Sequence, residues 1–131
     1  MHTDLSFENV LLRWEDVRGE APPRLRASII DFNALKDWGE VFEDGMLRAR
    51  AEKGRTYGAR EARITGAVDV YAAGYILKAV LAKYFSKEVR NSDPDLAGVS
   101  AVFERMMNAD PSRRETATSA RGKLCMMAPF S

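Results

Sequence analysis

One long apolar segment constrains the fold of this chain more than any other part of its sequence. Residues 67–85 contain few helix-breaking residues, and their apolar side chains fall on every face of the helix that they would form. A helix that is apolar all round is normally buried in the middle of a domain. Lys78 and Lys83 interrupt the segment, whose apolar run is shorter than the roughly 20 residues that span a membrane. We therefore expect a buried central helix.

Two strands are expected before this helix. Residues 9–14 and 27–32 are short apolar runs, and the second has β-branched residues at its centre, which is typical of strands. Residues 15–26 are polar and contain Gly19, Pro22 and Pro23, so they predict a long exposed connection. The pattern predicts a β-hairpin with a long loop.

Further helices are expected after the central one. Ser92-Asp93-Pro94 is a helix start signal, and apolar residues then recur at helical spacing until Asp110-Pro111 ends the run. A last short helix is predicted over about residues 116–124. Residues 36–66 are charged and weakly periodic, which indicates a segment held by tertiary contacts, with a short helix around residues 46–53.

Composition limits the classes of function. The 131 residues suffice for one domain, and a net charge of +1 with dispersed basic residues gives no reason to expect a nucleic acid partner. Cys125 is the only cysteine, which excludes an internal disulfide and favours a reducing compartment. The N-terminus has no signal-peptide pattern, so we expect an intracellular, cytoplasmic protein without a membrane partner.

The N-terminal residues carry a motif suited to phosphoryl transfer. That reaction requires a carboxylate near the attacking hydroxyl and oxygen ligands that hold Mg²⁺ against the phosphates. Residues 2–9 read His-Thr-Asp-Leu-Ser-Phe-Glu-Asn and directly precede the first predicted strand, while the second ends in Ile30-Asp31-Phe32. This arrangement resembles the catalytic loop of protein kinases and their metal-binding Asp-Phe-Gly motif.

Three downstream segments extend the resemblance in the correct order. Residues 57–61 resemble the Ala-Pro-Glu end of a kinase activation segment, with Arg60 in place of the proline. Residues 68–77 resemble the Asp-Val-Trp-Ser-Leu-Gly start of the hydrophobic central helix, and residues 106–117 resemble the Leu-x-x-Asp-Pro-x-x-Arg-Pro-Thr-Ala region. Residues 1–131 thus resemble the C-terminal lobe of a serine/threonine-like protein kinase, which implies a mainly α domain whose small β-hairpin bears the catalytic and metal-binding loops.

The resemblance implies a role for each motif residue. Asp4 would be the catalytic base that accepts or orients the substrate hydroxyl proton, and Asn9 and Asp31 would bind Mg²⁺ and, with it, ATP. Ser6 occupies the catalytic position where serine/threonine kinases usually carry a lysine that neutralises phosphoryl charge. His2 would be architectural.

Two long-range contacts are implied as well. Glu61 should pair with Arg114, and Asp69 should accept hydrogen bonds from backbone amides near Thr3. The alternative for the first contact is that Glu61 and Arg114 are solvated surface charges. If the pair is buried, removing one partner would cost about 3–5 kcal/mol.

Several positions depart from the family pattern. Thr3 replaces the arginine that would anchor an activation-loop phosphate, and Asn33 replaces the glycine after Asp31-Phe32, although asparagine tolerates left-handed backbone. Residues 61–69 are shorter than the family's corresponding stretch. Residues 86–93 leave little room for the usual helix at that point.

The nucleotide-gripping elements of the kinase amino-terminal lobe do not precede the catalytic loop in this sequence. We therefore expect the isolated chain to bind ATP poorly and to catalyse little or nothing. The face that meets that lobe should expose Val10, Leu12 and Phe7. Such an apolar patch favours self-association or a protein partner that supplies the missing surface.

Three functions remain open from the sequence. The first is a serine/threonine protein kinase, or the kinase half of one, acting on a protein substrate. The second is a pseudokinase module that binds a protein partner, which the substitutions at Thr3 and Ser6 favour and the retained acidic and amide residues oppose. The third is a small-molecule phosphotransferase of the aminoglycoside or choline kinase type, against which the matches at Asp69 and Arg114 favour a protein kinase.

Overall fold

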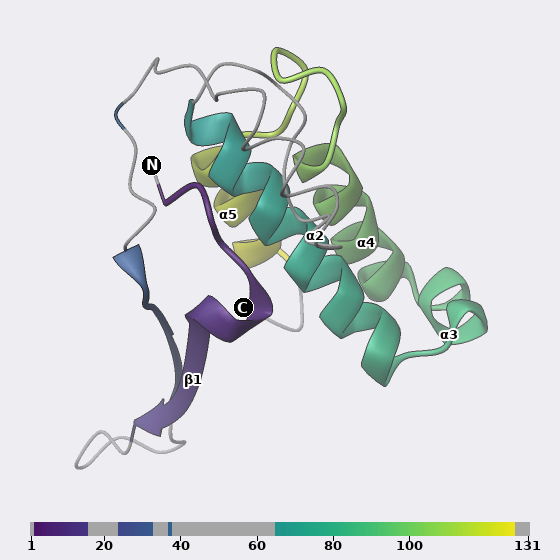
Figure 1. The fold of residues 1–131 in the computed structure, drawn as a ribbon. Coiled ribbons are helices and arrows are strands. Elements are labelled where there is room, and N and C mark those ends of the chain that lie inside the picture. The colour runs from purple at the N-terminus through teal and green to yellow at the C-terminus, as the bar shows by residue number, and fades with distance from the viewer. Residues whose placement is uncertain (1, 16–23, 33–36, 38–64, 128–131) are drawn as a thin grey trace.

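A computed structural model describes residues 2–15, 24–32, 37 and 65–127 of the chain. Within these residues the fold is mainly helical, as expected, with one two-stranded hairpin (Figure 1). The elements are a short 3₁₀ helix (Phe7–Asn9), strands β1 (Val10–Glu15) and β2 (Arg24–Ile29), and helices α2 (Gly66–Tyr84), α3 (Lys87–Ser92), α4 (Pro94–Met106) and α5 (Ala117–Cys125). The expected helix over residues 46–53 lies outside the described residues.

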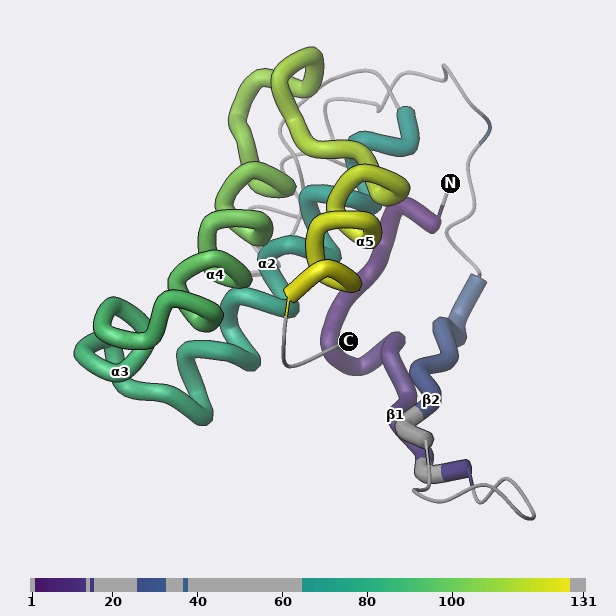
Figure 2. Tube along the Cα trace, turned by 180° about the vertical axis from the view of Figure 1, so that it is seen from behind, coloured from purple at the N-terminus to yellow at the C-terminus, as the bar shows by residue number. Residues whose placement is uncertain are grey.

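Helix α2 is the centre of the fold. It lies between the N-terminal segment on one side and α4 and α5 on the other (Figure 2). One hydrophobic cluster joins it to buried Val102 and Phe103 of α4, and a second joins its Ala72 and Ile76 to Leu5 in the N-terminal loop. The helix therefore connects the loop that carries the motif to the helical core.

The expectation that α2 is buried all round is wrong for its outer face. Val68, Ala72 and Ile76 are buried, but Leu77 and Tyr84 are exposed, Tyr84 to 71%. The reason is that the two hydrophobic clusters, which hold the contacts of α2 with α4, α5 and the N-terminal loop, include neither Leu77 nor Tyr84.

Gly74 permits α2 and α4 to approach closely. A Cβ atom added at Gly74 would lie 2.7 Å from the Cβ of Met106 and 3.1 Å from the carbonyl oxygen of Phe103. Contacts under 3.0 Å between such atoms force the structure to shift. This glycine therefore sets the distance between the two helices at the centre of the core.

The later helices begin where the sequence predicts. Asp93 caps α4, since its Oδ1 accepts hydrogen bonds from the amides of Asp95 (2.9 Å) and Leu96 (3.2 Å), and Pro94 fills the first helical position. Thr116 caps α5 through the Ser119 amide. Residues 86–93, which were expected to leave little room for a helix, form only the six-residue α3, whose first turn Ser86 caps by accepting from the Val89 amide.

The hairpin differs from prediction in its second strand. β1 pairs antiparallel with β2 in a register that sets Val10 opposite Ile29 and Glu15 opposite Arg24. β2 therefore starts and ends three residues earlier than expected, so residues 24–26 belong to the ladder rather than to the loop. The carboxylate of Glu15 stabilises this end, because it accepts from Arg13 (2.7 Å) and Arg26 (2.9 Å).

The predicted apolar patch is present in part. Phe7 and Leu12 are exposed, Leu12 to 63%, whereas Val10 is partly buried against the cluster around Leu5. Ile29 is also exposed, at 47%. The hairpin thus leaves apolar side chains uncovered beside the motif. Among the described helices, none combines the length and the hydropathy needed to cross a membrane.

Candidate functional site

Asp69 fixes the N-terminal loop to the central helix. Its Oδ2 accepts a hydrogen bond from the His2 amide and its Oδ1 accepts one from the Thr3 amide, both at 2.8 Å. The contact predicted between Asp69 and amides near Thr3 is therefore confirmed. Because a carboxylate acceptor makes these bonds charge-assisted, they are stronger than bonds between neutral groups.

Thr3 has an unusual backbone conformation that makes this double bond possible. Its φ is +59°, in the left-handed region that β-branched residues rarely adopt. Consecutive amides can point at one anion when the backbone adopts such a conformation. Strain of this kind persists only where surrounding contacts hold it, and it gathers at functional sites.

His2 joins the loop to the end of the second strand. The ring is buried, its Nε2 donates to the carbonyl oxygen of Ile30 at 2.9 Å, and it contacts the Phe32 ring edge-on with centroids 5.3 Å apart. Its buried Nδ1 has no hydrogen-bond partner in the described structure. These contacts agree with the architectural role expected for His2.

Asn9 orders the loop that carries Asp4. The buried amide of Asn9 donates through Nδ2 to the Asp4 carbonyl oxygen at 2.8 Å. An asparagine amide has one acceptor oxygen besides these donors, so the Asn9 Oδ1 remains the atom suited to a hard cation.

Asp31 lies close to Asn9 because the ladder continues past the strands. The Ile30 amide donates to the Asn9 carbonyl oxygen at 2.9 Å. Ile30 is thus paired with Asn9, and Asp31 is the next residue after Ile30. Asp31 is exposed and has a φ of +60°, which aspartate tolerates better than most residues. Asp31 therefore has a left-handed backbone. Asn33, for which left-handed backbone was considered, lies outside the described residues.

The described side chains include no cluster of three or more histidine, cysteine or carboxylate groups that could hold a metal. An ion shared by Asn9 and Asp31 would therefore need further oxygen ligands, which the phosphates of a nucleotide supply. Two protein ligands of the oxygen type suit Mg²⁺, which usually keeps several non-protein ligands.

Ser6 is buried, at 6% exposure. Little of this residue is therefore open to solvent. The catalytic assignment of Ser6 rests on its place in the motif and stays a prediction.

Arg114 is a second anchor of the helical core. It is buried, its Nε donates to the Asn108 carbonyl oxygen at 2.9 Å, its Nη1 donates to the Ala67 carbonyl oxygen at 2.7 Å, and its guanidinium stacks over Tyr71. The alternative that Arg114 is a solvated surface charge is therefore wrong. Its predicted partner Glu61 lies outside the described residues.

Sequence reasoning missed an ion-pair cluster around Glu115. This carboxylate accepts from Lys123 and from Arg105 (3.2 Å), and its side chain is only 8% exposed. The hydrogen bond from Lys123, followed by those from Ser119 and Arg105, lowers the pKa of Glu115 from 4.5 to about 2. The i, i+8 spacing to Lys123 across a turn gives no local signal, so only the packing of α4 and α5 reveals it.

Comparison of this chain with protein-family models, with curated proteins and with solved structures gave no match. The motif and the contacts above are therefore the basis for any assignment of function.

Proposed function

We propose that this chain is the C-terminal lobe of a protein-kinase-like domain whose family activity is ATP-dependent phosphoryl transfer to a protein serine or threonine hydroxyl. The observation that carries the proposal is the pair of hydrogen bonds that the Asp69 carboxylate accepts from the backbone amides of His2 and Thr3. The family resemblance implies this contact, and two residues that are 67 positions apart rarely meet in such geometry by chance.

The loop geometry supports distinct roles for three residues. Asp4 lies in the loop held by Asp69 and Asn9, and as a carboxylate it would accept or orient the proton of an attacking hydroxyl. Asn9 and Asp31 would bind Mg²⁺, which together with ATP supplies charge neutralisation on the transferred phosphoryl group. The chain's own contribution is to hold these oxygens in fixed positions.

The exposed hairpin supports weak nucleotide binding by this chain alone. Leu12 and Ile29 are exposed beside the motif, and an apolar platform open on one side buries little of a ligand's surface. A covering surface over these side chains would complete the site. We place the reaction in a reducing, cytoplasmic setting because Cys125 is an unpaired, exposed thiol.

Mn²⁺, which replaces Mg²⁺ and broadens nearby amide resonances, tests the proposal even when binding is weak. In the presence of ATP, broadening should concentrate on residues next to Asn9 and Asp31. The variant Asp31→Asn should lose it, whereas the matched control Asp95→Asn, at the start of α4, should keep it. Broadening that is absent, or that is unchanged in Asp31→Asn, would refute the metal site.

A pseudokinase that binds a protein partner is the second candidate, and the burial of Ser6 favours it. A short buried side chain cannot neutralise phosphoryl charge, and losing one such contact typically costs about 10²–10³ in rate. Single-turnover transfer from Mg-ATP tests this second candidate. We expect little or no transfer from the isolated chain, and clear transfer that Asp4→Asn abolishes would exclude the pseudokinase.

A further inference from the structure

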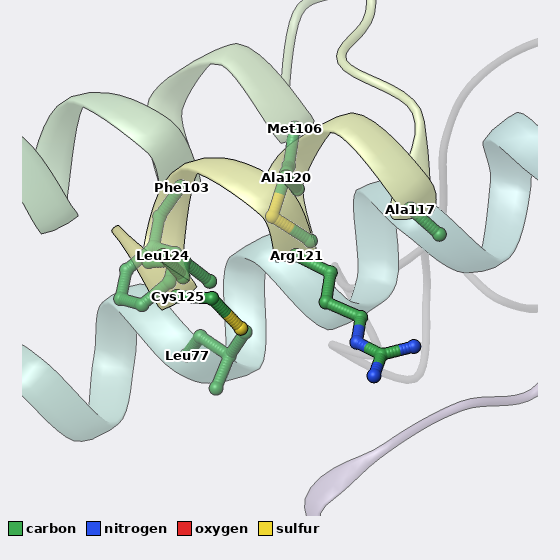
Figure 3. Close-up of a pocket in the computed structure, with 8 residues that line it drawn as sticks. All are labelled: Leu77, Phe103, Met106, Ala117, Ala120, Arg121, Leu124 and Cys125. Atoms are coloured by element: carbon green, nitrogen blue, oxygen red, sulfur yellow. The ribbon is translucent and has the colours of Figure 1, made fainter. Parts of the chain in front are cut away.

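The described part of the chain leaves apolar side chains uncovered in more than one place. One is the hollow between α2, α4 and α5, whose wall includes Leu77, Phe103 and Leu124 (Figure 3). Another is strand β1, where Leu11 is 52% and Leu12 63% exposed. The hollow is lined almost wholly by apolar atoms, so it carries no feature that specifies an occupant. The strand also has a free edge of backbone donors and acceptors, which are specific for another strand.

The hydrogen-bond pattern of the hairpin shows which backbone groups of β1 point outward. The Ile30 amide donates to the Asn9 carbonyl oxygen, and opposite residues in an antiparallel ladder alternate between bonded and non-bonded pairs. In the register of β1 and β2, Leu12 therefore belongs to a non-bonded pair, and its amide and carbonyl point away from β2. The Val10 amide fits this alternation, since it donates outside the ladder to the Phe7 carbonyl oxygen.

Strand β1 lacks the usual protection of a strand edge. Such edges are commonly blocked by proline, by a bulge or by lysine, whereas β1 has a regular register and contains neither proline nor lysine. Its one cation, Arg13, pairs with Glu15 at 2.7 Å. Within the described part of the chain, no element outside the hairpin bonds the backbone of Leu12. The hairpin projects from the helices (Figures 1 and 2), and two strands alone are only marginally stable until others join them.

The charges of the strands favour β1 over β2 as an edge that pairs with its own copy. β1 contains Arg13 and Glu15, so two copies bring together equal numbers of opposite charges. β2 contains Arg24 and Arg26 and no carboxylate. Two copies of β2 would therefore place only cations side by side, which destabilises a sheet. The β1 edge is thus complementary to itself in hydrogen bonding and in charge.

We propose that two copies of this chain pair antiparallel through their β1 edges and form a continuous four-stranded sheet. A two-fold axis at Leu12 sets this residue opposite its own copy, where each amide donates to the other carbonyl oxygen. The same register sets Leu11 opposite Arg13 of the second copy, so the two arginines do not face each other directly. The inference does not depend on the proposed phosphoryl transfer.

Proline at position 12 tests the pairing. Leu12→Pro removes the central outward amide and leaves the ladder within the hairpin intact, because proline is tolerated where the missing N–H faces away from the partner strand. In sedimentation equilibrium the parent chain should form a dimer, and Leu12→Pro should raise the dissociation constant by about tenfold or more. The matched control is Ile29→Pro. Its amide points outward at the free edge of β2, so it should dimerise as the parent chain does.

Cross-linking tests the register without proline. In a Cys125→Ser background, which removes the only cysteine, a short bis-maleimide should link Leu12→Cys to its own copy. Ile29→Cys, on the same face of the hairpin, should not cross-link, because the two cysteines would lie three strand spacings apart, about 14 Å. Three outcomes would overturn the proposal. They are sedimentation of the parent chain as a monomer, equal dissociation constants for folded Leu12→Pro and Ile29→Pro, and equal cross-linking of Leu12→Cys and Ile29→Cys.

Discussion

The Oδ1 atom of Asp69 lies 2.8 Å from the backbone nitrogen of Thr3, a residue 66 positions earlier in the chain. The other carboxylate oxygen holds the His2 amide at the same distance. Together these bonds keep Thr3 in a left-handed backbone conformation that it would otherwise avoid. The shape of the motif loop therefore depends on one side chain of the central helix.

Replacement of Asp69 by alanine should lower the free energy of unfolding by about 2–4 kcal/mol, because two charge-assisted hydrogen bonds are lost together. Asp69→Asn should lose most of this free energy as well. The asparagine NH₂ group would replace one acceptor oxygen and would face a backbone N–H, which is also a donor. Urea denaturation measures both changes. Asp95→Asn should lie within about 0.5 kcal/mol of the parent chain, and an equally small effect of Asp69→Ala would contradict the anchoring role.

Two glycines in helices should respond to alanine in opposite directions. Gly74→Ala should destabilise the chain by about 1–3 kcal/mol, since the new Cβ would meet Met106 at 2.7 Å. Gly122→Ala has open space around the added atom, so it should stabilise by about 0.5–1 kcal/mol through higher helix propensity. Both follow from the same urea titration. A stabilising Gly74→Ala would show that α2 and α4 are not closely packed there.

Arg114 should not tolerate lysine. The planar guanidinium bonds the carbonyl oxygens of Asn108 and Ala67 at once and stacks on Tyr71, and an ammonium group cannot do all three. We expect Arg114→Lys to lower the free energy of unfolding by about 2 kcal/mol. The control Arg113→Lys, on an exposed neighbour, should change it by less than about 0.5 kcal/mol. Equal effects of the two variants would argue that Arg114 acts only through its charge.

Glu115 should make stability depend on pH in the acid range. Its pKa is lowered from 4.5 to about 2 in the folded chain, so its contribution is present above pH 4.5 and is lost as pH falls toward 2. In the parent chain the thermal midpoint should fall between pH 4.5 and pH 2. In Glu115→Gln it should fall less over the same pH range, because this carboxylate no longer titrates. The exposed carboxylate of Glu104, which pairs with Lys78, serves as the control: Glu104→Gln should keep the parent slope. Parallel profiles for Glu115→Gln and the parent chain would rule out the role given to the cluster.

The starts of α2, α4 and α5 were predictable from the sequence to within about one residue, whereas α4 ends at Met106, before the expected stop at Asp110-Pro111. The central helix spans Gly66–Tyr84 rather than residues 67–85, and α4 and α5 begin next to Asp93 and Thr116. Capping side chains and helical periodicity involve residues only a few positions apart, so they can be recognised in the local sequence. The position of β2 was not predictable in this way, because a strand ends where its partner stops pairing.

The candidate site was predictable as a set of residues but not as a geometry. The motif named His2, Asp4, Asn9, Asp31 and Asp69, and the resemblance supplied the expected contact of Asp69. The left-handed backbone of Thr3 carries no sequence signal, because β-branched residues rarely adopt it, whereas Asp31 is of a type that tolerates it.

By itself, the sequence determined that the chain builds a hairpin and a series of helices around one apolar segment, because these choices depend on propensity, capping and spacing. Only the tertiary structure decided which face of α2 is covered, that Glu115 is enclosed by two cations, and that the two oxygens of Asp69 each hold one amide. Those features join residues far apart in the chain, and their geometry exists only after the helices and the loop have packed together.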